Sequence, residues 1–223
     1  MTIKQSQIFK ESEGDSYFSR NQKNMESAID KYVVQKLTED LSPFKDSIRN
    51  ILEIGCANGV KLRRVCSYFS GATGLGIDPS RIAVDVGNLE ISRESQGGVR
   101  LEIGTADSLP VENQSVDLVF FGFCLYLMDR QDLFKAVAEA DRVLRPGGFI
   151  AILDFDSNGR SKNPYSHKAG VYSYKNAYAD LFTASGHYCL VSKASISHSN
   201  TYFSRDNYER VALQILYKEF DAY

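Results

Sequence analysis

The chain has 223 residues, of which 43% are hydrophobic and 24% charged, so it can bury one substantial core and is most simply a single domain. A net charge of −2 and a pI near 6.0 give no general attraction to phosphate backbones or anionic lipid, which argues against nucleic acid and membranes as partners. The four cysteines form no CxxC pair, the polar N-terminus has no secretory character, and the longest apolar run, residues 118–128, is too short to cross a bilayer. We therefore expect a cytoplasmic protein with reduced thiols.

The N-terminal half predicts one helix followed by alternating strands and helices. Apolar residues at helical spacing between positions 25 and 41 predict the first helix, which Ser42 and Pro43 end. Strands are predicted over 51–55, 72–78, 99–104, 115–123 and 147–156, and helices over 60–69, 79–92 and 129–144. Pro79 is placed in the first turn of its helix. The near-continuous apolar character of 115–123 suits a central strand of a parallel sheet.

The C-terminal part has a different texture. Residues 157–174 are polar, aromatic and turn-rich and are interpreted as a long loop. A short helix over 174–186 and strands over 187–198 and 208–220 complete the chain. Strands that alternate with helices predict an α/β fold with a doubly wound sheet covered on both faces. One domain is expected, with an N-terminal cap and helix (1–45), a ligand-binding core (46–156) and a substrate-side segment (157–223).

Distinctive residues follow the first four predicted strands. In a doubly wound sheet, ligands bind outside the carboxyl ends of the strands, so these residues should converge. Asp78 lies about 20 residues past the first turn, the offset at which a carboxylate accepts hydrogen bonds from two ribose hydroxyls. The first turn is GxxxG, however, and lacks the middle glycine that lets a backbone cradle pyrophosphate.

Five segments between Ile51 and Phe155 resemble class I S-adenosylmethionine-dependent methyltransferases of the small-molecule branch. They are ILEIGCANG, GLGIDPS, GTADSLP, SVDLVFFGFCLYL and VLRPGGFIAILDFD, in that order. Each segment alone is weak, whereas five in sequence are specific. The resemblance implies a Rossmann-like sheet of seven strands, mostly parallel with an antiparallel last strand, and S-adenosylmethionine as cofactor.

The resemblance also implies roles for individual residues. Glu53 and the turn containing Gly55, Cys56, Ala57 and Gly59 would hold the methionine end of the cofactor. Asp78 would bind the ribose, with Pro79 beside the base. Contacts to the adenine would come from Ala106, Asp107 and Ser108, and the path to the methyl group would be lined by Phe121, Gly122 and Phe123. Ala57 departs from the pattern, because many relatives have glycine there.

The polar stretch before the first predicted helix suggests a further contact. Tyr17 and Arg20 form an aromatic and basic island that we expect to close over the cofactor, with Arg20 pairing with its carboxylate.

Methyl transfer to a small-molecule acceptor, such as a sugar or an aromatic metabolite, is the implied activity. In-line displacement requires alignment in a dry pocket more than a dedicated base. If a proton must leave the acceptor, the candidates to take it are Tyr126, Asp154 and His167. Asp154 and Asp156 form a DxD pair, but two carboxylates are weak grounds for a metal, and a metal-free site is favoured.

Several alternatives stay open on the sequence. Tyr165, Tyr172, Tyr174 and Tyr178 suit either a substrate lid or packing of the last helix. The site of methylation (O, N or C) and the oligomeric state are undetermined. The rival functions are an NAD(P)-dependent oxidoreductase on a similar sheet and a non-catalytic S-adenosylmethionine-binding protein.

Overall fold

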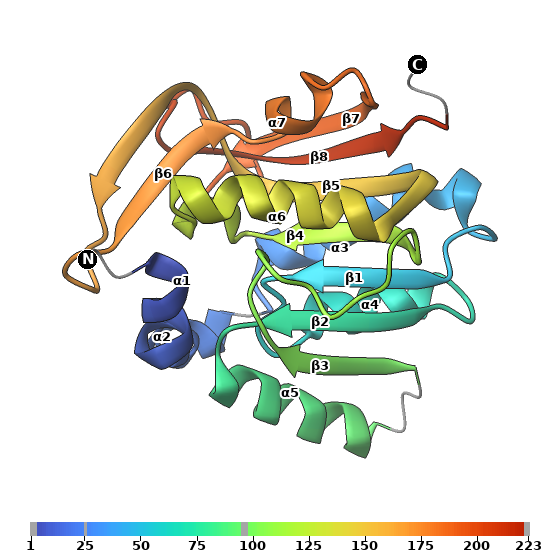
Figure 1. The fold of residues 1–223 in the computed structure, drawn as a ribbon, viewed down its shortest axis with the longest axis horizontal. Coiled ribbons are helices and arrows are strands. Elements are labelled where there is room, and N and C mark those ends of the chain that lie inside the picture. The colour runs from blue at the N-terminus through green and yellow to red at the C-terminus, as the bar shows by residue number, and fades with distance from the viewer. Residues whose placement is uncertain (1–3, 25, 95–97, 221–223) are drawn as a thin grey trace.

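In the computed structural model, helices cover both faces of one central sheet (Figure 1). The structure describes residues 4–24, 26–94 and 98–220. The α-helices are α1 (Gln5–Ile8), α2 (Gly14–Asn21), α3 (Ala28–Asp40), α4 (Val60–Tyr68), α5 (Arg81–Arg93), α6 (Arg130–Val143) and α7 (Asp180–Thr183). A π-helical turn (Phe9–Glu13) joins α1 to α2, and short 3-10 turns span Gln22–Asn24, Ser42–Phe44 and Leu125–Leu127. The strands are β1 (Asn50–Ile54), β2 (Thr73–Asp78), β3 (Val99–Ile103), β4 (Val116–Gly122), β5 (Leu144–Pro164), β6 (Tyr172–Ala177), β7 (Tyr188–Ser197) and β8 (Arg210–Lys218).

The sheet has the predicted topology. Its strand order is β3, β2, β1, β4, β5, β8, β7, and β6 pairs only with β5. Strands β1 to β5 are parallel, whereas β8 is antiparallel to both of its neighbours. The expected sheet with an antiparallel last strand is therefore confirmed, with β6 as an additional strand. β4 lies at the centre, and all of its residues are buried, as its apolar sequence predicts.

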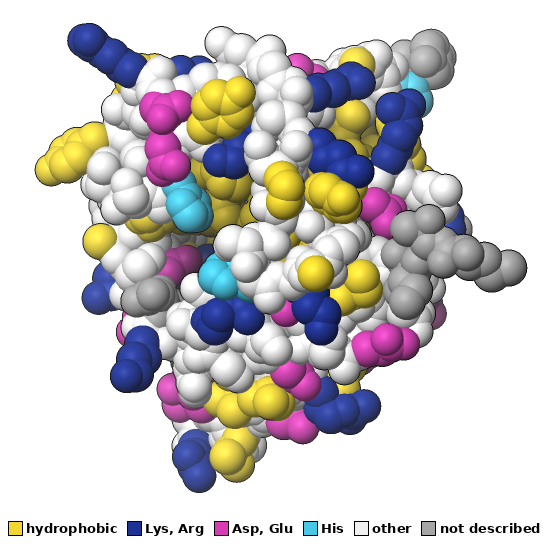
Figure 2. All heavy atoms as spheres, turned by 90° about the vertical axis from the view of Figure 1, so that its left-hand side faces the viewer, with side chains coloured by type: hydrophobic (Ala, Val, Ile, Leu, Met, Phe, Trp, Pro, Cys, Tyr) yellow, Lys and Arg dark blue, Asp and Glu magenta, His cyan; other side chains and the backbone are white. Residues whose placement is uncertain are grey.

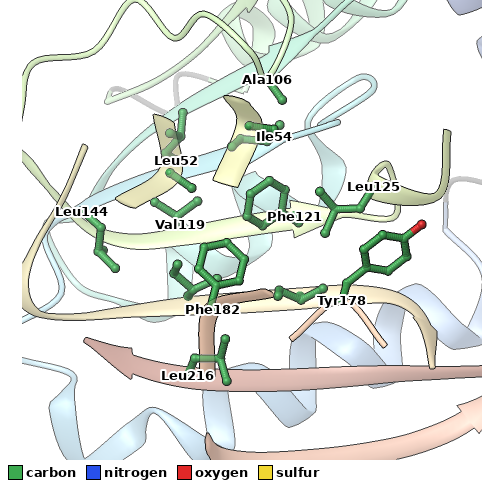
Figure 3. Packing of buried hydrophobic residues seen from close by; sticks show 14 of the residues in the cluster. Leu52, Ile54, Ala106, Val119, Phe121, Leu125, Leu144, Tyr178, Phe182 and Leu216 are labelled. Atoms are coloured by element: carbon green, nitrogen blue, oxygen red, sulfur yellow. The ribbon is translucent and has the colours of Figure 1, made fainter. Parts of the chain in front are cut away.

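Alternate residues of the central strands build two cores on opposite faces of the sheet. Leu52 of β1 and Phe121 of β4 face α6 and α7, and Phe121 contacts Phe182 with ring centroids 6.2 Å apart (Figure 3). Ile51 and Phe120 face the opposite side, which α3 and α4 cover. This period of two is the geometry of a β-strand buried on both faces.

The hairpin β5–β6 replaces a predicted loop. The expectation of a long loop over 157–174 is wrong, because β5 continues to Pro164 and pairs antiparallel with β6, where Lys162 lies opposite Tyr174. The helix expected over 174–186 shrinks to the four residues of α7. Alternating tyrosines at 172 and 174 are typical of a strand, and this period was hidden by the surrounding turn-forming residues. Pro79 also lies just before its helix rather than inside it, since Ser80 caps α5 with a hydrogen bond from the Ala83 N–H at 3.1 Å.

The N-terminal helices α1 and α2 lie over the carboxyl ends of the parallel strands (Figure 1). The Lys4 ammonium pairs with Asp132 at 2.9 Å, and the Gln5 side chain donates to the Leu127 carbonyl at 2.7 Å. On α2, Asp15 accepts the Ile82 N–H at 3.0 Å. These contacts hold the cover to α6 and α5. The division of the chain into cap, core and substrate-side segment stays a prediction.

Candidate functional site

A cavity of about 300 Å³ lies between the N-terminal cover and the carboxyl ends of β1, β2 and β4. Phe9, Tyr17 and Phe18 contribute to its wall from the cover, and Asp78 and Phe123 contribute from the sheet side. This is the place at which a doubly wound sheet binds ligands. The elements that form the cavity are far apart in the sequence and meet only in the folded chain.

The glycine-punctuated turn after β1 forms one edge of the cavity in an unusual backbone conformation. Gly55, Ala57 and Gly59 have φ values of 75°, 49° and 73°, in the left-handed region. A Cβ at Gly55 would lie 2.7 Å from the Cβ of Cys124, so both the conformation and the space require glycine there. Ala57 tolerates the left-handed conformation at some cost in strain, which explains why glycine suits this position.

Asp78 at the end of β2 is held against that turn. One carboxylate oxygen accepts the Ala57 N–H at 2.8 Å, and the other accepts the Ser80 N–H at 2.9 Å. Burial raises the pKa of Asp78, and these two hydrogen bonds oppose the rise. The carboxylate therefore lies in the cavity wall, fixed to the glycine turn, rather than pointing to bulk water.

The loop after β3 supplies the neighbouring wall. Thr105, Ala106 and Asp107 line the cavity, and the Ser108 N–H closes a turn on the Thr105 carbonyl at 3.2 Å. Ser108 itself is exposed and does not line the cavity. Asp107 thus lies on the same side of the cavity as Asp78.

A buried charge cluster around Lys61 forms another part of the wall. Lys61 of α4 lines the cavity, with its ammonium 3.7 Å from an Asp30 oxygen and 3.8 Å from a Glu53 oxygen. Glu53 is fully buried, and neither of its oxygens has a hydrogen-bond partner. Burial raises the pKa of Glu53 to about 7, and Lys61 opposes the rise. Such orphaned polar atoms beside a cavity are costly unless a ligand completes their hydrogen bonds.

Comparison with known proteins identifies a domain that includes the glycine-punctuated turn. Residues 51–148 match the model of a family described as "Methyltransferase domain". The matched part of the chain is a methyltransferase domain. This confirms the resemblance seen in the sequence.

Individual relatives of the chain differ in what their names say they act on. The chain is 27% identical over 154 residues to a malonyl-[acyl-carrier protein] O-methyltransferase of Methylococcus capsulatus, covering 69% of this chain and 54% of the relative. It is 33% identical over 119 residues to a demethylmenaquinone methyltransferase of Leptospira interrogans, covering 52% and 45%. The chain thus spans about half the length of these curated relatives.

Solved structures agree in fold. The Burkholderia thailandensis 1,6-didemethyltoxoflavin-N1-methyltransferase, a structure with bound S-adenosylhomocysteine, superposes with a TM-score of 0.73 at 15% identity, covering 96% of this chain and 88% of that one. The [4+2]-cyclase SpnF superposes with a TM-score of 0.67 at 16% identity, covering 87% and 82%. At these identities the likeness shows the fold alone.

The cavity gathers only part of the residue set predicted from the sequence. The predicted cofactor residues in its wall are Tyr17, Gly55, Ala57, Asp78, Pro79, Ala106, Asp107, Gly122 and Phe123. Glu53, Cys56 and Gly59 lie directly behind it: Glu53 packs under Gly122, where an added Cβ would come 2.7 Å from its carboxylate. Phe121 points away from the cavity into the core facing α6.

The three proton-acceptor candidates lie outside the cavity wall. Asp154 is buried and accepts the Leu125 N–H at 2.8 Å and the Phe155 N–H at 2.8 Å, so its carboxylate holds the backbone after β4. Burial raises the pKa of Asp154 to about 7. Tyr126 is buried behind Phe123, and His167 is exposed beside Tyr165. None of the three is a lining residue of the cavity, although Tyr126 interacts with Tyr17, which is.

Two wall residues that the sequence did not single out are Lys61 and His198. Lys61 stands at an ordinary helical position, and its burial depends on Asp30 of α3. His198 follows β7, lines the cavity and stacks on Phe123 with ring centroids 5.4 Å apart at 19°. In the sequence His198 is one of three isolated histidines, and no local pattern distinguishes it from the others.

Arg20 is turned away from the cavity. Its guanidinium pairs with Glu13 at 2.5 Å and donates to the Tyr165 hydroxyl at 3.3 Å. Glu13 is 2% exposed, so the Arg20 guanidinium is needed to stabilise the buried negative charge of its carboxylate.

We expect Arg20→Ala to lower the free energy of unfolding by about 1–3 kcal/mol, because it leaves the buried Glu13 charge unpaired. Urea unfolding measures this loss, and the double variant Glu13→Gln/Arg20→Ala should recover part of it. Titration calorimetry should show unchanged affinity for S-adenosylhomocysteine. A clear loss of that affinity in the stable double variant would instead support the sequence hypothesis that Arg20 binds the cofactor carboxylate.

Proposed function

We propose that this protein transfers a methyl group from S-adenosylmethionine to a small, flat acceptor that carries an ionisable proton. One observation carries the proposal: a single cavity is lined by the Asp78 carboxylate, fixed to the glycine turn, and by the Lys61 ammonium, with the unsatisfied Glu53 carboxyl packed directly behind its wall. This arrangement suits a ligand with a neutral nucleoside at one end and a charged amino acid at the other.

The residues present fit that cofactor. Asp78 would accept hydrogen bonds from the ribose, and Asp107 would accept one from the adenine amino group. At the other end, Lys61 would bind the carboxylate of the cofactor's amino acid. The ammonium group of that amino acid would donate hydrogen bonds to Glu53 or Asp30. Among the described wall residues, Lys61 is the one lysine or arginine, so the diphosphate of a dinucleotide would meet carboxylates instead of cations. The wall therefore disfavours an NAD(P)-dependent oxidoreductase.

The acceptor side is apolar apart from His198. When bound, S-adenosylmethionine supplies an electrophilic methyl group on a positively charged sulfur. Ile29, Phe123, Leu153 and Val211 line the adjoining space and would exclude water from it. Stacked rings at this end favour a flat acceptor.

His198 is the side chain that we assign to take the acceptor proton. Burial against Phe123 and Phe155 lowers the pKa of His198, with Lys175 acting in the same direction and Glu209 opposing it. The imidazole is therefore largely neutral near pH 7 and available as a base. It replaces Tyr126, Asp154 and His167 in this role because it alone of the four lines the cavity.

The test combines binding with turnover. Titration calorimetry should show binding of S-adenosylhomocysteine and none of NADH. Isotope-labelled S-adenosylmethionine should then transfer its methyl group to members of a panel of aromatic hydroxyl and ring-nitrogen compounds. Binding of NADH in place of S-adenosylhomocysteine would overturn the proposal. S-adenosylhomocysteine binding without transfer across the panel would favour the non-catalytic alternative.

The buried Glu53 carboxyl predicts a pH dependence of stability. Its pKa is about 7 in the folded protein against an ordinary 4.5, so the folded state holds this proton more tightly than the unfolded chain. The stabilisation is fully present below pH 4.5 and is lost as the pH rises to about 7. Asp154 acts in the same direction.

Glu53→Gln should remove that part of the pH dependence, which amounts to as much as about 3 kcal/mol. Urea unfolding of both proteins across this pH range measures the difference. The exposed Glu112→Gln is the matched control and should behave as the unmodified chain does. Parallel stability profiles for Glu53→Gln and the unmodified chain would contradict a protonated Glu53.

A further inference from the structure

The β5–β6 hairpin concentrates positive charge in a chain whose net charge is negative. Between Asp156 and Asp180 the sequence has no Asp or Glu but four Lys and Arg residues: Arg160, Lys162, Lys168 and Lys175. We call residues 157–177 the cationic hairpin. Within the described parts of the chain, none of these four cations lies within 4.0 Å of a carboxylate oxygen. No ion pair therefore compensates their charge, and Glu209 and Asp206 act on Lys175 only at longer range.

Aromatic side chains lie beside these cations. The Lys162 ammonium is 3.8 Å from the centroid of the Tyr172 ring, and that of Lys175 is 4.1 Å from the Phe155 ring. The loop between β7 and β8, residues 199–209, adds Tyr202, which is 77% exposed, and Phe203, which is 61% exposed. We call this segment the aromatic loop.

The cationic hairpin and the aromatic loop form one continuous surface. The Asn207 side chain donates to the Ser157 hydroxyl at 2.8 Å and accepts the Asn158 N–H at 2.8 Å. Lys175 also donates to the Tyr208 carbonyl. On the face that carries the hairpin, Lys and Arg side chains lie among hydrophobic ones (Figure 2). His198, which lines the acceptor end of the cavity, immediately precedes the loop.

We propose that this surface docks the protein on an anionic phospholipid membrane. Lysine and arginine side chains near an anionic bilayer each add to the attraction, and exposed Tyr and Phe insert at the headgroup level. A protein partner fits less well, because interfaces between proteins are depleted in lysine. The inference goes beyond the proposed function: docking would place the acceptor end of the cavity at the lipid surface, where apolar acceptors concentrate. It revises the expectation from overall charge that membranes are poor partners.

Vesicle co-sedimentation tests the proposal on the full chain. The protein should sediment with phosphatidylcholine vesicles that contain phosphatidylglycerol and stay in solution with phosphatidylcholine alone. Arg160→Gln/Lys162→Gln should weaken binding about tenfold or more. Tyr202→Ser/Phe203→Ser should weaken it by a similar factor. Lys31→Gln/Arg93→Gln removes one exposed Lys and one exposed Arg from α3 and α5, away from the hairpin, and should bind as the unmodified chain does.

The outcomes separate this inference from the proposed function. Equal loss in the hairpin and control variants, or no preference for anionic vesicles, would overturn lipid docking. So would a lack of vesicle binding combined with salt-sensitive binding to a purified acidic protein through the hairpin. S-adenosylhomocysteine affinity, measured on the same preparations, should not change in any of these variants. Vesicle binding by a protein that does not bind S-adenosylhomocysteine would refute the proposed function and leave docking intact.

Discussion

Asp78→Ala should weaken S-adenosylhomocysteine binding by at least about a hundredfold, because two hydrogen bonds between a carboxylate and the ribose are lost. The same change removes the acceptors for the Ala57 and Ser80 N–H groups, so the glycine turn loses its support as well. Titration calorimetry gives the affinity, and thermal unfolding without ligand gives the structural part of the loss.

Two variants separate these contributions. Asp78→Asn keeps one oxygen for the Ala57 N–H, loses the acceptor for the Ser80 N–H and has no charge, so we expect a smaller loss of stability than in Asp78→Ala together with weakened binding. Asp85→Ala removes an exposed carboxylate from α5 and is the matched control, for which affinity and stability should not change. If Asp78→Asn bound S-adenosylhomocysteine as tightly as the unmodified protein, Asp78 would be a structural residue of the turn and not a ribose ligand.

The features that the sequence predicted well are local ones. The turn after β1 could be anticipated because left-handed backbone leaves a direct mark, glycine at positions 55 and 59. Asp78 could be anticipated because its distance along the chain from that turn is set by one helix and one strand. The sheet order followed in the same way from alternating strands and helices and the uniform burial of β4.

The features that could not be predicted depend on contacts between distant segments. Lys61 becomes a cavity residue only because α3 brings Asp30 to it and β1 places Glu53 beneath it. The N-terminal cover depends on Lys4 and Gln5 reaching residues more than 120 positions away. No periodicity in either segment encodes the partner on the other. Gly122 illustrates the same limit, since its lack of a side chain matters only because Glu53 packs against it.

On the proposed function, these distant contacts also explain why the sequence predicts more cofactor residues than acceptor residues. The cofactor end uses residues that directly follow β1, β2 and β3, at fixed places in a common topology. The proposed acceptor end draws on Ile29 of α3, Leu153 of β5, His198 after β7 and Val211 of β8, which are far apart in the sequence and all line the cavity. Acceptor chemistry therefore has to be argued from the cavity wall, where the His198 ring stacks on Phe123.

His198→Ala should lower kcat for a protic acceptor by about 10²- to 10⁴-fold, the usual contribution of a positioned base. S-adenosylhomocysteine affinity should stay unchanged, because the imidazole lies at the acceptor end. The unmodified enzyme should lose activity as the pH falls through the pKa of His198, which lies below the ordinary 6.5, since protonation removes the base. His198→Ala should lack this acidic limb of the profile.

His167→Ala provides the matched control, because it removes an exposed imidazole that lies outside the cavity wall. It should retain both kcat and the pH profile. Stacking on Phe123 gives His198 a packing role as well, so the near-isosteric His198→Gln distinguishes the two contributions: it fills the space but is not basic. Full activity in His198→Gln would show that His198 only shapes the acceptor end, and that the acceptor proton leaves to water or was never removed.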